Sequence, residues 1–161
     1  MKTLLFVALA AVTIAWTQPA SAPDTEPAVA AIAAVLDDFH DAASQGDGQR
    51  YFSHFAPDAV FLGTDASERW TLAEFRAYAL KRFEQGLSWT YHPRGRHVFI
   101  GAGGHTAWFD EVAVNARYGE CRGTGVLVHL DGAWRIAQYN LSIPIPNEIA
   151  LEVVGMIRGL E

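Results

Sequence analysis

The spacing of hydrophobic residues predicts helices in the first half of the chain and strands in the second. A first helix is expected over residues 27–44, where apolar side chains recur at helical intervals: Ile32, Val35, Leu36 and Phe39. A second, short helix carries Tyr51. A third opens at the capping box Thr71-Leu-Ala-Glu74, whose hydroxyl and carboxylate satisfy free backbone amides, and it ends near Gly86.

From about residue 89 the period of the pattern changes to two, which is typical of strands. Four strands are expected at 89–100, 105–116, 121–130 and 133–143, after a short earlier strand at 59–62. The turns between the four are marked by 101–104, by Tyr118-Gly119 and by Asp131-Gly132. A last helix follows Asn147. Helices followed by an antiparallel meander predict an α+β fold.

The turn positions also predict which strand residues face each other. Tight hairpins without bulges give three pairs: Leu130 with Ala133, Ala116 with Cys121, and Ile100 with His105. Directly opposed side chains lie on the same face of a sheet. One face then collects large aromatic residues and glycines, and we expect this face to be concave and covered by the helices.

This register points Asp110 toward the concave face, and His97 lies diagonally from it. A carboxylate among apolar side chains has a raised proton affinity, which suits a general base or acid near neutral pH. Asp110 and His97 are therefore the candidate catalytic residues. The structural alternative is a satisfied or solvent-facing carboxylate. A single bulge would also shift the register, moving Asp110 out and Glu111 in.

Further polar and aromatic side chains are candidates for ligand binding. Gln138 and Asn140 stand out because two amides on an inward strand face need hydrogen-bond partners. The other candidates are Tyr51, Trp70 and Trp108, with a place in the core or pocket wall as the alternative, and His129, with a hydrogen-bonded structural role as the alternative. The spacing of the histidines and Asp110 matches no known metal motif, so neither a metal nor a cofactor is expected.

Residues 134–144, Trp-Arg-Ile-Ala-Gln-Tyr-Asn-Leu-Ser-Ile-Pro, together with Ala107-Trp-Phe-Asp-Glu111, resemble the last strands of SnoaL-like domains in the nuclear transport factor 2-like superfamily. The resemblance extends upstream to residues 55–65 and to Glu68-Arg-Trp70, and it covers roughly 28–146. It implies a cone-shaped fold of N-terminal helices on a curved antiparallel sheet, and relatives commonly form dimers. The superfamily holds isomerases, dehydratases, cyclases, hydrolases and non-catalytic binders, so the fold alone does not fix the function.

The N-terminus carries the pattern of an export signal. Met1-Lys2 precedes an apolar run over 4–16, and Ala20-Ser-Ala22 supplies the small residues of a cleavage site. We expect a signal peptide at 1–22, a linker at 23–27, the SnoaL-like domain at 28–146 and a C-terminal helix at 147–161. The protein would be periplasmic or secreted, with no membrane association after cleavage. An uncleaved anchor is the alternative.

Charge and composition restrict the possible partners. The formal net charge is −6 and the chain has no basic run, which argues against binding to nucleic acid or to an anionic membrane. The leading hypothesis is a small-molecule-binding domain with cofactor-free acid–base chemistry, of isomerase, dehydratase or cyclase type, on a small apolar substrate. The alternatives are a non-catalytic binding or assembly module, and a dimer whose own side chains fill the cavity.

A homodimer is expected through the sheet face opposite the cavity. The predicted register leaves an apolar group there: Phe109, Val126, Val128, Ala137, Tyr139 and Leu141. So much contiguous apolar surface is unusual for a monomer, and a twofold copy would bury it. The C-terminal helix could cover the same face within one chain.

Overall fold

Three helices precede the main strands, as the periodicity predicts. In the computed structural model, which describes residues 25–160, α1 spans Glu26–Gln45, α2 spans Gly48–Ser53 and α3 spans Leu72–Glu84. Helix α1 ends at Gly46, which adopts the left-handed conformation with a φ of 67°. The predicted capping box at the start of α3 is present, with Thr71 and Glu74 satisfying each other's backbone amides.

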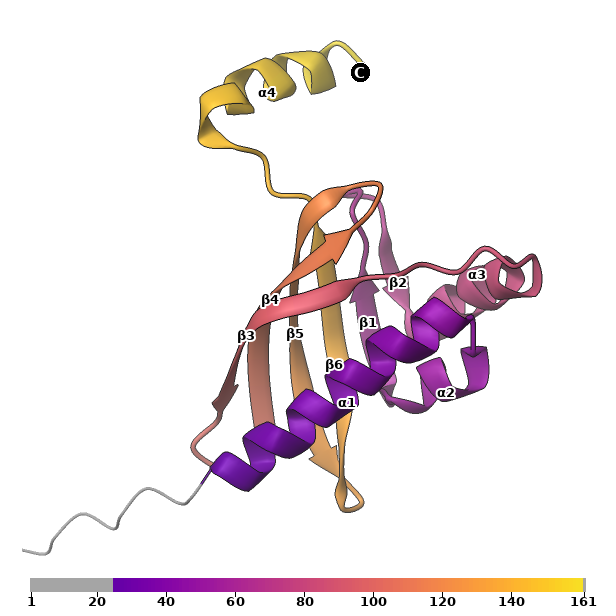
Figure 1. The fold of residues 1–161 in the computed structure, drawn as a ribbon, viewed down its shortest axis with the longest axis vertical. Helices are drawn as coiled ribbons and strands as arrows, with labels where there is room; N and C mark the ends of the chain where they lie inside the picture. The colour runs from indigo at the N-terminus through magenta and orange to yellow at the C-terminus, as the bar shows by residue number, and fades with distance from the viewer. Residues whose placement is uncertain (1–24, 161) are drawn as a thin grey trace, which may run out of the picture.

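The strands form a single six-stranded sheet. They are β1 (Phe55–Leu62), β2 (Arg69–Thr71), β3 (His92–Ile100), β4 (Thr106–Asn115), β5 (Gly119–Leu130) and β6 (Ala133–Ser142), in the spatial order β2-β1-β6-β5-β4-β3. Strand β1 pairs parallel with β6, and the other pairs are antiparallel. Helix α1 crosses in front of the sheet, while α2 and α3 lie toward the β1 side (Figure 1). The predicted α+β cone is therefore confirmed.

The register within the meander differs from the prediction at two of its three hairpins. Leu130 pairs with Ala133 as expected. Cys121, however, pairs with Ala113 instead of Ala116, because the β4–β5 turn closes between Asn115 and Gly119. The Asn115 side chain stabilises this turn by accepting hydrogen bonds from the backbone amides of residues 117 and 118, at 2.9 and 3.0 Å.

This difference exchanges the two faces of β4. The partner of Cys121 stands three positions earlier than expected, and since side chains alternate along a strand, an odd shift turns each one to the other face. Phe109 and Glu111 consequently point toward the helices and are buried, whereas Trp108 and Asp110 lie on the outer face. At the β3–β4 hairpin, Ile100 pairs with Ala107 and not with the predicted His105. This shift is even, so residues of β3 and β4 near this hairpin that were expected to share a face still do so.

A bulge changes the face of β6 halfway along the strand. Ile136 pairs with Leu127, but Gln138 pairs with the preceding residue of β5, so one extra residue of β6 is accommodated. Trp134 and Ile136 are buried before the bulge, and Tyr139 and Leu141 are buried after it. The expected inward placement of Gln138 and Asn140 is therefore wrong.

Aromatic side chains fill the centre of the cone. The buried rings come from α1, α2, α3 and the inner face of the sheet: Phe39, Tyr51, Phe52, Phe55, Phe61, Phe75, Phe109, Trp134 and Tyr139. Phe61 and Phe75 stack with ring centroids 3.8 Å apart. Gly123 and Gly125 allow other parts of the protein to approach the strand closely: a Cβ at Gly125 would lie 2.7 Å from the Phe109 ring.

The C-terminal segment leaves the sheet. After β6, the segment Ile143-Pro-Ile-Pro146 leads to a short 3-10 helix, η1 (Asn147–Ile149), and to α4 (Ala150–Arg158). The predicted last helix thus exists, but it buries none of its residues and projects away from the body (Figure 1). It does not cover the outer face of the sheet. Within the described part of the chain, no helix combines the length and apolar character needed to cross a membrane.

Candidate functional site

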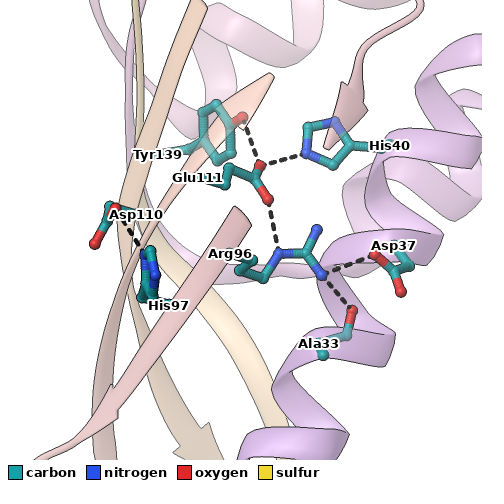
Figure 2. A network of polar contacts seen from close by, with 8 residues as sticks. All are labelled: Ala33, Asp37, His40, Arg96, His97, Asp110, Glu111 and Tyr139. Carbon is teal, nitrogen blue, oxygen red and sulfur yellow. Dashed lines mark hydrogen bonds and ion pairs between the residues drawn. The ribbon is translucent and has the colours of Figure 1, made fainter. Parts of the chain in front are cut away.

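A buried carboxylate lies between the sheet and α1. Glu111 of β4 is 1% exposed and points toward the helix. One of its oxygens, Oε1, lies 2.6 Å from Nε2 of His40 on α1, and the other, Oε2, accepts a hydrogen bond of 2.7 Å from Nε of Arg96 on β3 (Figure 2). Three elements distant in sequence therefore meet at a single carboxylate.

Three further groups complete this network: the Ala33 carbonyl, the Asp37 carboxylate and the Tyr139 hydroxyl. Arg96 donates from Nη1 to the Ala33 carbonyl oxygen at 3.1 Å and to Asp37 at 2.7 Å, which ties β3 to α1. The Tyr139 hydroxyl of β6 donates weakly to Oε1 of Glu111 at 3.5 Å. The carboxylate is thus surrounded by donors, as a buried charge requires.

The electrostatics keep Glu111 ionised. Burial raises the pKa of Glu111, but the hydrogen bonds from His40 and Arg96 and the positive charge of Arg96 outweigh it and hold the pKa below its ordinary value. Burial, reinforced by the Glu111 charge, raises the pKa of Tyr139 well above its usual range, so Tyr139 remains a neutral donor. Near neutral pH the site therefore contains a carboxylate and a guanidinium held at fixed distances.

The ionised carboxylate decides which nitrogen of His40 carries a proton. A carboxylate only accepts hydrogen bonds, so Nε2 of His40 is the donor in their contact. In the neutral imidazole, Nδ1 is then the basic nitrogen, and it points away from Glu111 (Figure 2). Residues 25–160 offer no hydrogen-bond partner to this nitrogen.

His40 lines a small polar cavity between α1 and the segment before β3. The cavity has a volume of about 220 Å³, and its other lining residues are Asp37, Asp41, Ser44, Thr90, Tyr91, His92 and Pro93. A histidine oriented by a buried carboxylate at the wall of a cavity is the arrangement of a general acid–base group. We call this the His40 cavity.

A second cavity lies on the α3 side of the cone. Its volume is about 200 Å³, and aromatic rings dominate its lining: Phe61, Trp70, Phe75, Tyr78, Trp89, Tyr91 and Tyr118, with Gly63, Thr64, Glu68, Arg82 and Leu141. Tyr91 lines both this aromatic cavity and the His40 cavity. Burial raises the pKa of Tyr91 to about 12, so its hydroxyl is neutral at physiological pH.

Asp110 and His97 do not lie where the sequence analysis expects them. They are next to each other on the outer face of the sheet, with His97 Nδ1 3.4 Å from Asp110 Oδ1 (Figure 2). Their side chains are 41% and 66% exposed, respectively, and neither lines a described cavity. The expected inward placement is wrong because the faces of β4 are exchanged. A catalytic role for the pair stays a prediction.

The six expected ligand-binding residues are dispersed over the fold. Trp70 lines the aromatic cavity, and His129 lines a separate cavity of about 580 Å³ beside the start of α1. Tyr51 is buried in the core. The remaining three, Trp108, Gln138 and Asn140, lie on the outer face, where Asn140 donates to Thr124 at 3.5 Å. The structure does not bring the six together, and their binding roles are untested.

Sequence reasoning missed His40 and Arg96 and reached Glu111 only as the alternative register. His40 stands four residues after Leu36, so it interrupts the apolar stripe of α1. A polar residue in a buried stripe needs a hydrogen-bond partner, so the position of His40 in the sequence already indicated a buried polar contact. No sequence signal marked Arg96. The described residues contain no group of three or more His, Cys, Asp or Glu side chains suited to a metal, and the expected absence of cofactors remains a prediction.

Helices on a curved, unclosed sheet with polar groups on its inner face define a protein of the nuclear transport factor 2-like class. Residues 32–146 match the family model of the SnoaL-like domain, and the chain belongs to this family. No curated protein matches the chain in sequence.

Similar solved structures have low sequence identity and show the fold alone. One is a candidate dehydratase of the NTF2-like family from Streptomyces avermitilis, with a TM-score of 0.63 and 12% identity, covering 75% of this chain and 99% of that one. A candidate scytalone dehydratase from Novosphingobium aromaticivorans has the same score and identity, covering 75% and 87%. A candidate calcium/calmodulin-dependent protein kinase II association domain from Xanthomonas campestris has a TM-score of 0.55 and 23% identity, covering 84% and 99%.

Proposed function

We propose that this chain is an exported small-molecule-binding protein whose His40–Glu111 pair performs cofactor-free acid–base chemistry, of isomerase, dehydratase or cyclase type. The observation that carries the proposal is the 2.6 Å contact between a buried, ionised carboxylate and a histidine that lines a cavity. This pair replaces Asp110 and His97 as the leading catalytic candidates.

The geometry assigns a role to each group. Glu111 fixes the tautomer of His40 and would stabilise the imidazolium that forms when Nδ1 takes a proton from a substrate carbon. Arg96 keeps Glu111 ionised and in place. Protonated His40 would then return the proton to another carbon, as in an isomerisation, or deliver it to a leaving hydroxyl, as in a dehydration. Two of the similar structures are described as candidate dehydratases, which is compatible with this chemistry.

Export is the second part of the proposal. It rests on the charged, apolar and small-residue segments of residues 1–22, which lie outside the described residues. N-terminal sequencing of protein collected outside the cytosol should begin between residues 20 and 24. Recovery of intact protein beginning at Met1 from the cytosol would contradict export.

We also propose a homodimer through the outer face of the sheet. Phe109, Tyr139 and Leu141, which were expected there, are buried in the core. Phe99 and Trp108 take their place: their rings stack 5.7 Å apart, and the two residues are 47% and 48% exposed. Val126, Val128 and Ala137 remain half-buried on the strands beside them. Such a patch favours a second copy of the chain.

A non-catalytic binding or assembly module is the second candidate function. Glu111 is fully engaged with Arg96 and His40, and the network already ties α1 to the sheet. Aromatic side chains fill much of the cone, and the aromatic cavity and the His40 cavity are each close to 200 Å³. In a non-catalytic module, the network around Glu111 would only stabilise the fold.

A generic proton-abstraction assay distinguishes these functions. The ring of 5-nitrobenzisoxazole opens when a base removes its carbon-bound proton, so the compound tests for a base beside a small cavity. We expect His40→Gln to lower kcat/KM by about 10²-fold, with a smaller loss for Glu111→Gln. The matched controls on the outer face, His97→Gln and Asp110→Asn, should retain the wild-type rate. Loss of activity in these controls, or no dependence on His40, would contradict the proposal.

A further inference from the structure

A further cavity of about 330 Å³ lies beside the aromatic cavity. Four residues line both: Arg82, Trp89, Tyr91 and Tyr118. The two cavities therefore adjoin at the end of the cone bounded by the C-terminal end of α3, the β1–β2 turn and the β4–β5 turn. We call the combined space the aromatic recess.

One buried donor in this recess has no partner. Arg82, in the last turn of α3, has its Nε buried without a hydrogen bond, and its guanidinium carbon lies 5.7 Å from the centre of the Tyr78 ring. It forms no ion pair within residues 25–160, whereas Arg50, Arg94 and Arg96 each contact a carboxylate. An unsatisfied buried N–H is unfavourable, so an acceptor from a ligand would stabilise it.

The charge of the recess is positive although the chain as a whole is acidic. Arg117 of the β4–β5 turn is a second guanidinium without an ion pair in the described part of the chain, and it lies over the Tyr118 ring at 5.3 Å. Glu68 is the one carboxylate among the described residues that line the recess. Its Oε2 accepts a hydrogen bond of 3.2 Å from the Asp65 backbone amide, which holds it in the β1–β2 turn. Two cations thus face one anion, in a protein of net charge −6.

The walls favour a flat ring. Trp70 is nearly parallel to both Phe61 and Phe75, with interplanar angles of 18° and 13°. These three rings stack on one another, with the ring centroids of Phe61 and Phe75 3.8 Å apart, and their remaining faces and edges can bind a planar ring by offset stacking or by edge contacts. The aromatic cavity of about 200 Å³ is small for a ligand site, which restricts the ligand to one or two rings.

We propose that the aromatic recess binds a planar aromatic carboxylate, with its ring against the aromatic residues that line the recess and its carboxylate on Arg82, close to Arg117. A guanidinium pairs with a carboxylate through two parallel hydrogen bonds, which would use the unsatisfied Nε. The inference rests on the proposed small-molecule binding and names the class of ligand. Because Tyr91 lines both the recess and the His40 cavity, the bound ligand would lie next to the proposed acid–base group.

Calorimetric titration of the full chain with 2-naphthoate and with its uncharged amide, 2-naphthamide, tests the inference. We expect the carboxylate to bind more tightly than the amide by about tenfold or more, because only the carboxylate forms a charge-assisted pair. Arg82→Met and Arg82→Gln should both abolish this preference. Arg76→Met is the matched control, since Arg76 is also on α3 but lies over Phe52, at 5.0 Å, and does not line the recess.

Equal affinity for the carboxylate and the amide in the wild-type protein would overturn the inference, and so would a preference that persists in both Arg82 variants. Binding of the amide alone would leave small-molecule binding intact while rejecting an anionic ligand. Absence of binding by both compounds would reject the recess as an aromatic site. The proton-abstraction assay with the His40 variant is independent of these results, so failure of this inference and failure of the proposed chemistry are distinguishable.

Discussion

Glu111 and Asp110 are neighbours in the chain with opposite environments. Glu111 is buried against Arg96 and His40, whereas Asp110 lies on the outer face. Strand alternation predicts that only one of the two points inward. Which one does so depends on the β4–β5 turn, which the Asn115 side chain closes between Asn115 and Gly119 and not around the expected Tyr118-Gly119 pair. The hydrogen bond from Arg96 to Glu111 was not predictable, because it depends on the approach of α1 to β3.

The lowered pKa of Glu111 makes a prediction for acid stability. A carboxyl group with a folded-state pKa below its ordinary value of 4.5 stabilises the folded protein above that value. This stabilisation is lost as the pH falls from about that value through the lower folded-state pKa. In Glu111→Gln, the free energy of unfolding should therefore vary less with pH in this acidic window. Denaturant titrations at several pH values measure this free energy. If it varies with pH as steeply in Glu111→Gln as in the wild type, the lowered pKa of Glu111 is contradicted.

Among the elements, the long helices and the meander strands were predictable because their periodicity and caps are local. The alternation in β4 to β6 and the capping box of α3 are examples. The short strand β2 and the parallel pairing of β1 with β6 were not predicted, because both depend on contacts between segments far apart in sequence. Similarly, no local signal marked the β6 bulge, which turns Gln138 and Asn140 outward.

The packing at this bulge predicts a large effect for a small substitution. A Cβ at Gly125 would clash with the Gln138 backbone oxygen and would lie 2.7 Å from the Phe109 ring. Because the backbone at a bulge cannot easily shift, Gly125→Ala should destabilise the protein by about 1–3 kcal/mol. Gly103→Ala, which meets nothing within 4 Å, is the control and should stay within about 0.5 kcal/mol of wild type. Thermal unfolding of both variants decides this, and equal stabilities would contradict the packing argument.

For the whole molecule, the SnoaL-like fold was predictable from the last strands, and the family match over 32–146 confirms it. The residues that make up the outer face were not predictable, because the exchange of faces in β4 moved Phe109 into the core and Trp108 out of it. Helix α4 buries none of its residues and leaves this face open. The apolar patch that remains carries the dimer proposal.

The dimer proposal predicts a change in mass for one substitution. Trp108→Glu places a charge in the centre of the patch, so it should convert a dimer to a monomer in sedimentation equilibrium. Leu151→Glu on α4, where the leucine is 88% exposed, should leave the dimer intact. A wild-type protein that is monomeric at micromolar concentration would contradict the interface.

The central claim is that the fold brings α1 against β4 so that Glu111 holds His40 with Nδ1 available as a base. Long-range ¹H–¹⁵N NMR spectra of the imidazole nitrogens test it directly, at a pH where histidine is neutral. We predict that His40 shows the tautomer protonated at Nε2, that Glu111→Gln changes this tautomer population, and that Asp110→Asn does not. A His40 protonated at Nδ1, or a spectrum that is the same in the Glu111 variant, would contradict the claim.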